Sequence, residues 1–298
     1  MAKITIDEVC AVITTYCPDS SILDRAKRAR VQVGHLIVVD DTGSDECGLE
    51  PGLLGSDVMY IKRDENLGIA KSLNIGVTAA MALGYKWVLT LDDDTLISKE
   101  YVAELLGFLN KGEIASGALG VIGLSRGGER QRSTSKDAEY RRKRALITSG
   151  SLINMDGFNA VGGFSEDMFI DLVDFDYCTR LRKKRYEVIQ LATIGMQHKV
   201  GDSTIKHYLG IPVTIYNHSP FRLYYQTRNS LIFFKRNLLF DPILSCYILL
   251  DVIRVPMKAA FFEDQKMKRV VYLFRGIVDG VRGRTGRFVD RNNATKHV

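Results

Sequence analysis

Cysteine is scarce in this chain and shows no pairing pattern. Five cysteines lie scattered among the 298 residues, at Cys10, Cys17, Cys47, Cys178 and Cys246, and none forms a C-x-x-C pair. Zinc sites and disulfide frameworks use cysteines at short, regular spacings. The sequence therefore argues against both, and scattered thiols fit a reducing cytoplasm.

Long apolar runs are also missing. The opening segment MAKITIDEVC has no apolar stretch of the kind that a secretion signal requires. The most apolar segment, residues 243–250, is followed by Asp251 and Arg254. It falls short of the about 20 apolar residues that span a bilayer, so we expect it to be buried or to lie in a membrane interface.

The net charge of +6 is concentrated at the C-terminal end. Residues 254–298 hold eleven Lys or Arg against four Asp or Glu, a net +7, which leaves −1 for the rest of the chain. Such asymmetry favours an anionic surface or a polyanionic partner. The alternative is a C-terminal helical bundle that forms a dimer or closes one side of a binding site, with its charges solvated.

Short apolar runs alternate with helical stretches in the first half of the chain. Residues 9–16, 35–41, 57–63 and 86–94 read as strands, and residues 21–30, 67–84 and 98–110 as helices, the last with Ser98 as N-cap. A basic loop is expected at 125–144, then a helix at 174–186 and a strand at 187–192. This order predicts an α/β fold with a mostly parallel sheet covered on both faces.

Three of the predicted strands end in polar or acidic residues: Thr14 and Thr15, Asp40 and Asp41, and Asp92 to Asp94. The carboxyl ends of parallel strands meet at one edge, where ligands of such sheets bind. Carboxylates there suit Mg²⁺ or Mn²⁺, which pair one or two of them with substrate phosphates. The alternative is a solvated turn before the next helix.

Other phosphate chemistries are disfavoured. The D-x-D-x-T pattern of aspartate phosphatases fails because Thr95 comes one place early. The chain has no G-x-x-x-x-G-K-[ST], and its first turn, TTYCPDSS, lacks G-x-G-x-x-G.

A second group of acids, Asp171, Asp174 and Asp176, lies at the start of a helix that becomes strongly basic. The helix dipole accounts for this order of charges. It does not account for the apolar residues interleaved in FIDLVDFDY, which draw carboxylates inward. A half-buried carboxylate has a raised pKa and can act as a general base. His198, behind the strand 187–192, either is packed or returns to the metal as a nitrogen ligand.

Seven motifs in this order resemble the inverting GT-A glycosyltransferases of family 2, in the rhamnosyltransferase and galactofuranosyltransferase branch. They are VITTYCP, LIVVDDTGSDE, NLGIAKSLNIGV, LTLDDDT, GGFSEDMFIDLVDFDYCTRLR, QHKVGD and YYQTRN, between Val9 and Arg236. The resemblance implies a catalytic GT-A domain at 1–218 and a basic helical region at 219–298 that associates with membrane or dimerises.

The resemblance also implies roles for individual residues. Asp174 matches the catalytic base, although Val173 stands where many members carry Glu. Asp94 and His198 match metal-facing positions, and Asp93 is expected to matter least for the metal. Arg228 and Asn229 match an acceptor or diphosphate position. The residues matched to donor binding are Thr14, Tyr16, Asp40, Asn66, Lys71, Asn74, Asp92 and Asp93.

The function implied is transfer of a sugar, with Mn²⁺ or Mg²⁺, to a lipid-linked or polysaccharide acceptor in bacterial cell-surface glycan synthesis. Rhamnose from dTDP-rhamnose is favoured, and galactofuranose or another hexose from a UDP-sugar is the alternative. We expect a cytoplasmic protein, peripheral on the membrane, with no nucleic-acid partner and homodimerisation left open. An alternative of another class is a basic membrane- or nucleic-acid-binding protein.

Overall fold

The computed structural model describes residues 3–43, 49–126, 139–198, 203–208, 211–216, 220–262 and 265–288. Most of the loop predicted at 125–144 lies outside these residues. The central sheet has nine strands, in the order β3 (Val58–Lys62), β2 (His35–Asp40), β1 (Val9–Thr15), β4 (Trp87–Asp92), β8 (Ser151–Asn154), β6 (Leu119–Arg126), β9 (Glu187–His198) and β5 (Thr95–Ile97), with β7 (Tyr140–Arg142) beside β9.

Strands β3, β2, β1 and β4 are parallel, as predicted, and β8 runs antiparallel between β4 and β6. In the ladder Thr15 is opposite Asp40, and Thr14 is opposite Asp92. The three polar strand ends therefore meet at one edge of the sheet, which confirms the predicted convergence.

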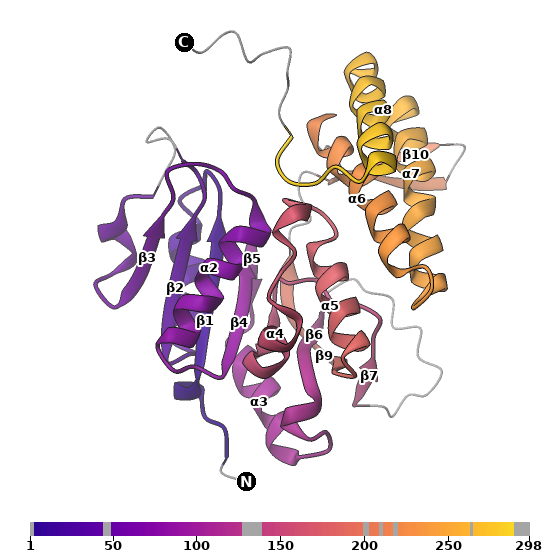
Figure 1. The fold of residues 1–298 in the computed structure, drawn as a ribbon. Helices are drawn as coiled ribbons and strands as arrows, with labels where there is room; N and C mark the ends of the chain where they lie inside the picture. Colours follow the sequence, from indigo (N-terminus) through magenta and orange to yellow (C-terminus); the bar gives the residue numbers. More distant parts are fainter. Residues whose placement is uncertain are drawn as a thin grey trace.

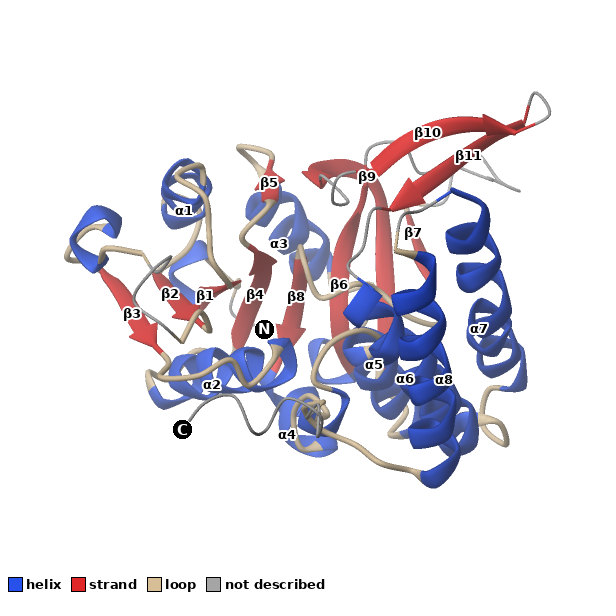
Figure 2. Cartoon of the chain, turned by 90° about the horizontal axis from the view of Figure 1, so that it is seen from above, coloured by secondary structure: helices blue, strands red, loops and turns tan. Residues whose placement is uncertain are grey.

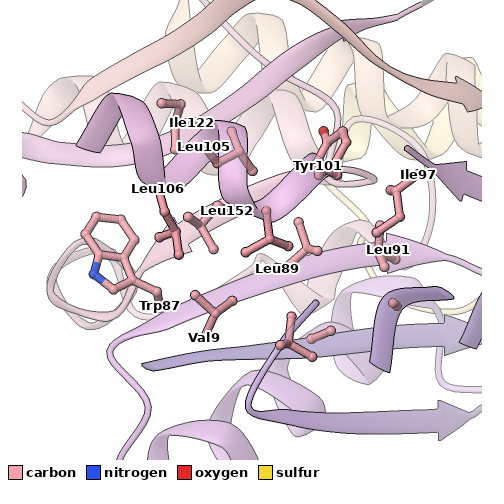
Figure 3. Close-up of a cluster of buried hydrophobic side chains, with 14 of the residues drawn as sticks. Val9, Trp87, Leu89, Leu91, Ile97, Tyr101, Leu105, Leu106, Ile122 and Leu152 are labelled. Carbon is pink, nitrogen blue, oxygen red and sulfur yellow. The ribbon is translucent and has the colours of Figure 1, made fainter. Parts of the chain in front are cut away.

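Helices cover both faces of this sheet (Figure 2). Helices α1 (Ile22–Arg30) and α3 (Tyr101–Lys111) lie over one face, and α2 (Ile69–Ala82), α4 (Met155–Val161) and α5 (Val173–Lys183) over the other. Alternate residues of β1 serve the two cores, because side chains along a strand point to opposite faces. Val9 and Ile13 pack under α1 and α3, the core in Figure 3, whereas Val12 packs under α2.

Three sequence expectations fail for reasons of tertiary structure. Helix α3 begins at Tyr101 with Glu100 as N-cap, so Ser98 is not its cap. Residues 95–97 form β5, because β9 extends past its predicted end and pairs with them, Thr95 opposite His198. Cys17 is disulfide-bonded, against the expectation from cysteine spacing, since spacing along the chain does not report distance in the fold.

The C-terminal region is helical, as predicted, after a β10 (Ser203–Tyr208) and β11 (Ile211–Tyr216) hairpin that the sequence did not suggest. Helices α6 (Pro220–Asn237), α7 (Pro242–Phe262) and α8 (Lys266–Arg282) gather beyond α5 (Figure 1). Asp241 precedes Pro242 and its Oδ1 accepts a hydrogen bond from Leu244 N at 3.1 Å, the predicted helix start. Within the described ranges, no helix is long and apolar enough to cross a membrane.

Candidate active site

A cavity of about 840 Å³ lies where the carboxyl ends of β1 and β4 face the start of α5 and one side of α6. Its lining comes from parts of the chain that are far apart in sequence. They include residues 14–16, the acidic turn 92–94, residues 169–175, and residues of α6 such as Arg222, Tyr225 and Gln226. The predicted donor residues Thr14, Tyr16, Asn66, Asp92 and Asp93, and the predicted base Asp174, all line it.

The three acids of the turn after β4 have different surroundings. Asp93 accepts a hydrogen bond from Thr15 Oγ1 at 2.6 Å and one from Tyr16 N at 3.4 Å. Burial raises the pKa of its carboxyl, and the charge of Asp94 raises that pKa further. Asp93 therefore fastens the end of β1 to the acidic turn, while Asp92 and Asp94 line the same cavity.

The two acids after β2 separate into one interior and one cavity residue. Asp40 is fully buried and accepts hydrogen bonds from Tyr60 Oη at 2.7 Å and Thr42 N at 3.0 Å; it does not line the cavity. Asp41 does, and it accepts from Gly68 N at 2.8 Å and Leu67 N at 3.1 Å. Burial raises the pKa of Asp41. The sequence resemblance pointed to Asp40, whereas the neighbouring Asp41 is the acid that lines the cavity.

Three residues at the start of α2 were matched to donor binding, and only one of them lines the cavity. Asn66 lines the cavity, and its Oδ1 accepts from Gly68 N at 3.0 Å. Lys71 and Asn74 do not line it; both bind Glu166, at 2.9 Å, and Asn74 also accepts from Phe164 N at 2.8 Å. These two residues fasten α2 to the segment before α5.

The wall that carries the predicted base has an unusual backbone. Phe169, Asp171 and Leu172 all have φ near +62°, a positive value that residues with side chains rarely adopt. Asp171 and Asp174 line the cavity, whereas Asp176 is buried against Arg180 Nε, at 2.7 Å, and the Ser165 hydroxyl. Only two of the three predicted acids therefore face the cavity.

Among the described residues that line this acidic cavity, Arg222 is the basic one, and sequence reasoning missed it. Its Nε and Nη2 bind the Asp171 carboxylate at 3.0–3.2 Å. Burial alone would lower the pKa of the guanidinium, but the negative charges of Asp171, Asp92 and Asp174 raise it. Arg222 lies near the start of the same predicted helix as Arg228. The sequence resemblance pointed to Arg228 and not to Arg222.

Arg228 and Asn229 lie behind the wall, not in the cavity, and both are buried. Asn229 Nδ2 donates to the carbonyl oxygens of Ile170, Met168 and Asp171, at 2.7, 2.9 and 3.0 Å. Arg228 Nη2 donates to Met168 O at 3.0 Å, and its Nη1 donates to Gly286 O. The pair thus fixes the positive-φ segment from behind.

The acidic turn offers hard oxygen donors for a cation. Asp92 and Asp94 present carboxylates to the cavity, which suits Mg²⁺ or Mn²⁺ completed by substrate phosphates and water. Across the described residues, no group of three or more His, Cys, Asp or Glu is arranged to hold a metal by protein side chains alone. The backbone of His198 lies opposite Thr95, next to Asp94, but its side chain is outside what is described.

Known proteins share both sequence and fold with this chain. The dTDP-rhamnosyl transferase RfbF of Shigella flexneri is 26% identical, over 93% of this chain and 97% of RfbF. S. aureus TarS 1–349 has a TM-score of 0.56 at 14% identity, over 93% of this chain and 81% of TarS 1–349. GalNAc-T7, solved with UDP, GalNAc and Mn²⁺, has a TM-score of 0.55 at 13% identity, over 92% of this chain and 56% of GalNAc-T7.

The two solved structures bear on the fold alone, and they confirm the predicted GT-A architecture. The family is shown by sequence: residues 10–168, more than half of the chain, match the model described as Glycosyl transferase family 2. The chain belongs to glycosyltransferase family 2.

Proposed function

We propose that this glycosyltransferase moves rhamnose from dTDP-rhamnose, with inversion, onto a lipid-linked or polysaccharide acceptor of a bacterial cell-surface glycan. The donor assignment is supported by the similarity to RfbF along nearly the whole of both chains. The mechanism is supported by one observation above all: the carboxylates of Asp92, Asp94 and Asp174, from distant parts of the sequence, line one cavity.

Each group in the cavity has a proposed part in the reaction. Asp174 accepts the proton of the acceptor hydroxyl as that oxygen attacks the anomeric carbon. Asp92 and Asp94 would hold Mg²⁺ or Mn²⁺, which supplies charge neutralisation for the departing diphosphate. Thr14, Tyr16 and Asn66 bind the nucleotide side of the donor. Only the resemblance supports the assignment of Asp40 to the pyrimidine ring of the nucleotide. We propose Asp41 as the acid that reaches the donor.

The place of reaction in this proposal is the cytoplasmic face of the membrane. Support comes from the basic C-terminal region and from the exposed apolar residues of α7 and α8.

The test is transfer of rhamnose with purified full-length protein, with and without Mn²⁺ or Mg²⁺. We expect Asp174→Asn to lower kcat by at least about 100-fold, the range for loss of a general base. Asp156→Asn, the same charge change at an exposed first-turn residue of α4, serves as the matched control and should be unaffected. Transfer by Asp174→Asn at the wild-type rate contradicts the assignment of the base.

Donor identity is read separately from thermal unfolding. Ligand binding to the folded state raises the melting temperature in proportion to RT ln(1 + [L]/Kd). With Mn²⁺ present, dTDP-rhamnose should raise it more than UDP-galactofuranose or UDP-GlcNAc does. A larger shift with a UDP-sugar would replace the donor in this proposal and leave the mechanism intact.

A further inference from the structure

Helix α8 packs on α6 through two glycines. Gly276 and Gly280 are buried and lie four residues apart, so they share one face of the helix. An added Cβ at Gly276 would lie 2.7 Å from Tyr224 O, and one at Gly280 would lie 2.9 Å from Leu231 Cβ. The two helix backbones therefore approach closely, and α6 covers this face of α8, as the paired helices in Figure 2 show.

The opposite face of α8 is apolar and open to solvent. Met267, Val270, Val271, Phe274 and Val281 retain between 47% and 78% of their full exposure. Their spacing of three, four and seven residues places them on one stripe. Phe274 lies two residues before Gly276, about 200° around the helix, so the stripe points away from α6. We call these five residues the α8 stripe.

A row of basic residues borders the α8 stripe. Lys268, Arg275 and Arg282 recur at every seventh position and therefore run along one side of the helix. Asp279 is the one acid of α8, and it already binds Tyr224 Oη at 2.9 Å and Arg284 at 3.0 Å. Lys268 and Arg282 are exposed, whereas Arg275 lies over the Phe288 ring at 5.6 Å. The outward surface of the helix thus combines apolar side chains with exposed basic ones.

We propose that the α8 stripe and its basic row dock on the surface of an anionic phospholipid bilayer. Apolar side chains enter the boundary of headgroups and acyl chains, while Lys and Arg meet the anionic headgroups. A second copy packed antiparallel through α8 fits less well, because the two basic rows would then lie on the same side of the helix pair. Residues 289–298 offer only Val289, Ala294 and Val298 as apolar side chains, too few to cover the stripe.

Docking through α8 would place the cavity beside the bilayer. Helix α6 meets α8 through Tyr224 and Leu231 and lines the cavity through Arg222 and Gln226. Helix α6 therefore lies between α8 and the cavity. The purpose of docking, which is access to a lipid-linked acceptor, rests on the proposed function. The test of docking itself needs no donor.

The test is flotation of the full-length protein with vesicles of phosphatidylcholine alone and with vesicles that also contain phosphatidylglycerol. Wild type should float with the anionic vesicles only, and less so at high salt. Phe274→Asp should lower binding at least tenfold. Each of Lys268→Gln and Arg282→Gln should lower it about fivefold, the effect of one basic residue at an anionic surface. Val31→Asp, an exposed apolar residue just after α1, is the matched control and should bind like wild type.

The outcomes separate docking from donor chemistry. Equal flotation with both vesicle types, no flotation, or wild-type flotation of Phe274→Asp overturns the proposal. Light scattering that finds a wild-type dimer and a Phe274→Asp monomer, with no vesicle binding, assigns the stripe to self-association instead. All variants are checked for wild-type melting temperature and for stabilisation by dTDP-rhamnose. Wild type that fails to float but binds donor refutes docking alone, and wild type that floats without binding donor refutes the donor assignment alone.

Discussion

The adjacent acids of the turn after β4 have different surroundings, so we expect a mutation at each to have a different effect. Asp93 is bound by the Thr15 hydroxyl, whereas the sequence indicated only that the middle acid matters least for a metal. That role could not be foreseen, because it depends on the parallel pairing of β1 with β4, which brings residues 78 positions apart into contact.

A double-mutant cycle of Thr15→Val and Asp93→Asn measures this fastening. We expect a coupling free energy of about 1 kcal/mol in urea unfolding, the usual worth of a partly buried hydrogen bond. Thr90→Val combined with Asp93→Asn is the control cycle, because the Thr90 hydroxyl binds Thr148 O and Ser151 O instead. Strictly additive effects in the first cycle would show that the bond does not stabilise the fold.

Asn229 offers a test of positioning at a residue that does not line the cavity. Asn229→Ala removes three hydrogen bonds to the positive-φ wall, so the wall should lose the placement of Asp171 and Asp174. We expect kcat to fall at least tenfold, about 1.4 kcal/mol of barrier, with the donor KM nearly unchanged. Steady-state kinetics with separate kcat and KM decides this.

Asn237→Ala is the matched control, since Asn237 is equally buried on α6 but binds Phe233 O of its own helix and Lys183 Nζ at the far end of α5, not the segment 168–171. It should lose stability with kcat preserved. A rise in donor KM alone for Asn229→Ala would contradict positioning and restore the acceptor or diphosphate role that the sequence indicated for Arg228 and Asn229. That role was inferred from motif order, which does not reveal which side of a helix faces a cavity.

At the scale of elements, α5 and α7 are joined by a buried acid. Asp241, at the start of α7, binds Arg182 of α5 at 2.6 Å and also binds Arg144. Burial raises the pKa of Asp241, but the hydrogen bonds from Arg144 and Arg182 outweigh it and hold the pKa below its usual value of 3.8. The ion pairs therefore stabilise the fold above about pH 3.8, and this contribution is lost as the pH falls through the lower folded-state pKa.

Asp241→Asn should accordingly lower the free energy of unfolding by about 2 kcal/mol at neutral pH, with the difference shrinking below pH 3.8. Urea unfolding from pH 7 down to pH 3 measures it. Asp57→Asn breaks an exposed pair with Arg30 and should cost less than about 1 kcal/mol. A pH-independent difference for Asp241→Asn would show that packing, and not charge, holds α7.

An element could be predicted from the sequence when it was long enough to show a pattern. It could not when it formed only through contacts with residues far away in the sequence. The apolar runs at 9–16, 35–41, 57–63 and 86–94 became β1 to β4, because each is long enough to show its pattern. Strands β5 and β7 have three residues each and exist only because β9 pairs with them. No local signal marks such strands.

At the scale of the whole molecule, the predicted boundary between residues 1–218 and 219–298 crosses the cavity wall. Helix α6 supplies Arg222 to the cavity and Asn229 to the wall behind it. We therefore expect a fragment of residues 1–218 to unfold without a sharp transition and to gain no stability from dTDP-rhamnose, whereas the full chain melts in one cooperative step. Calorimetry of both proteins tests this. A fragment that melts cooperatively and binds donor would make the boundary a true domain border.

Phe169, Asp171 and Leu172 hold backbone angles that few side chains adopt, and hydrogen bonds from α6 keep them there. Ordering the backbone of one residue costs about 1–2 kcal/mol in entropy. Here that loss accompanies folding. In the proposed reaction, a sugar that enters the cavity would therefore not have to order this segment, and more of its contact energy would appear as affinity. A rigid wall also discriminates by shape, since it cannot adapt to a sugar that fits poorly. We therefore expect this turn to favour both the affinity and the selectivity of the proposed site for its sugar.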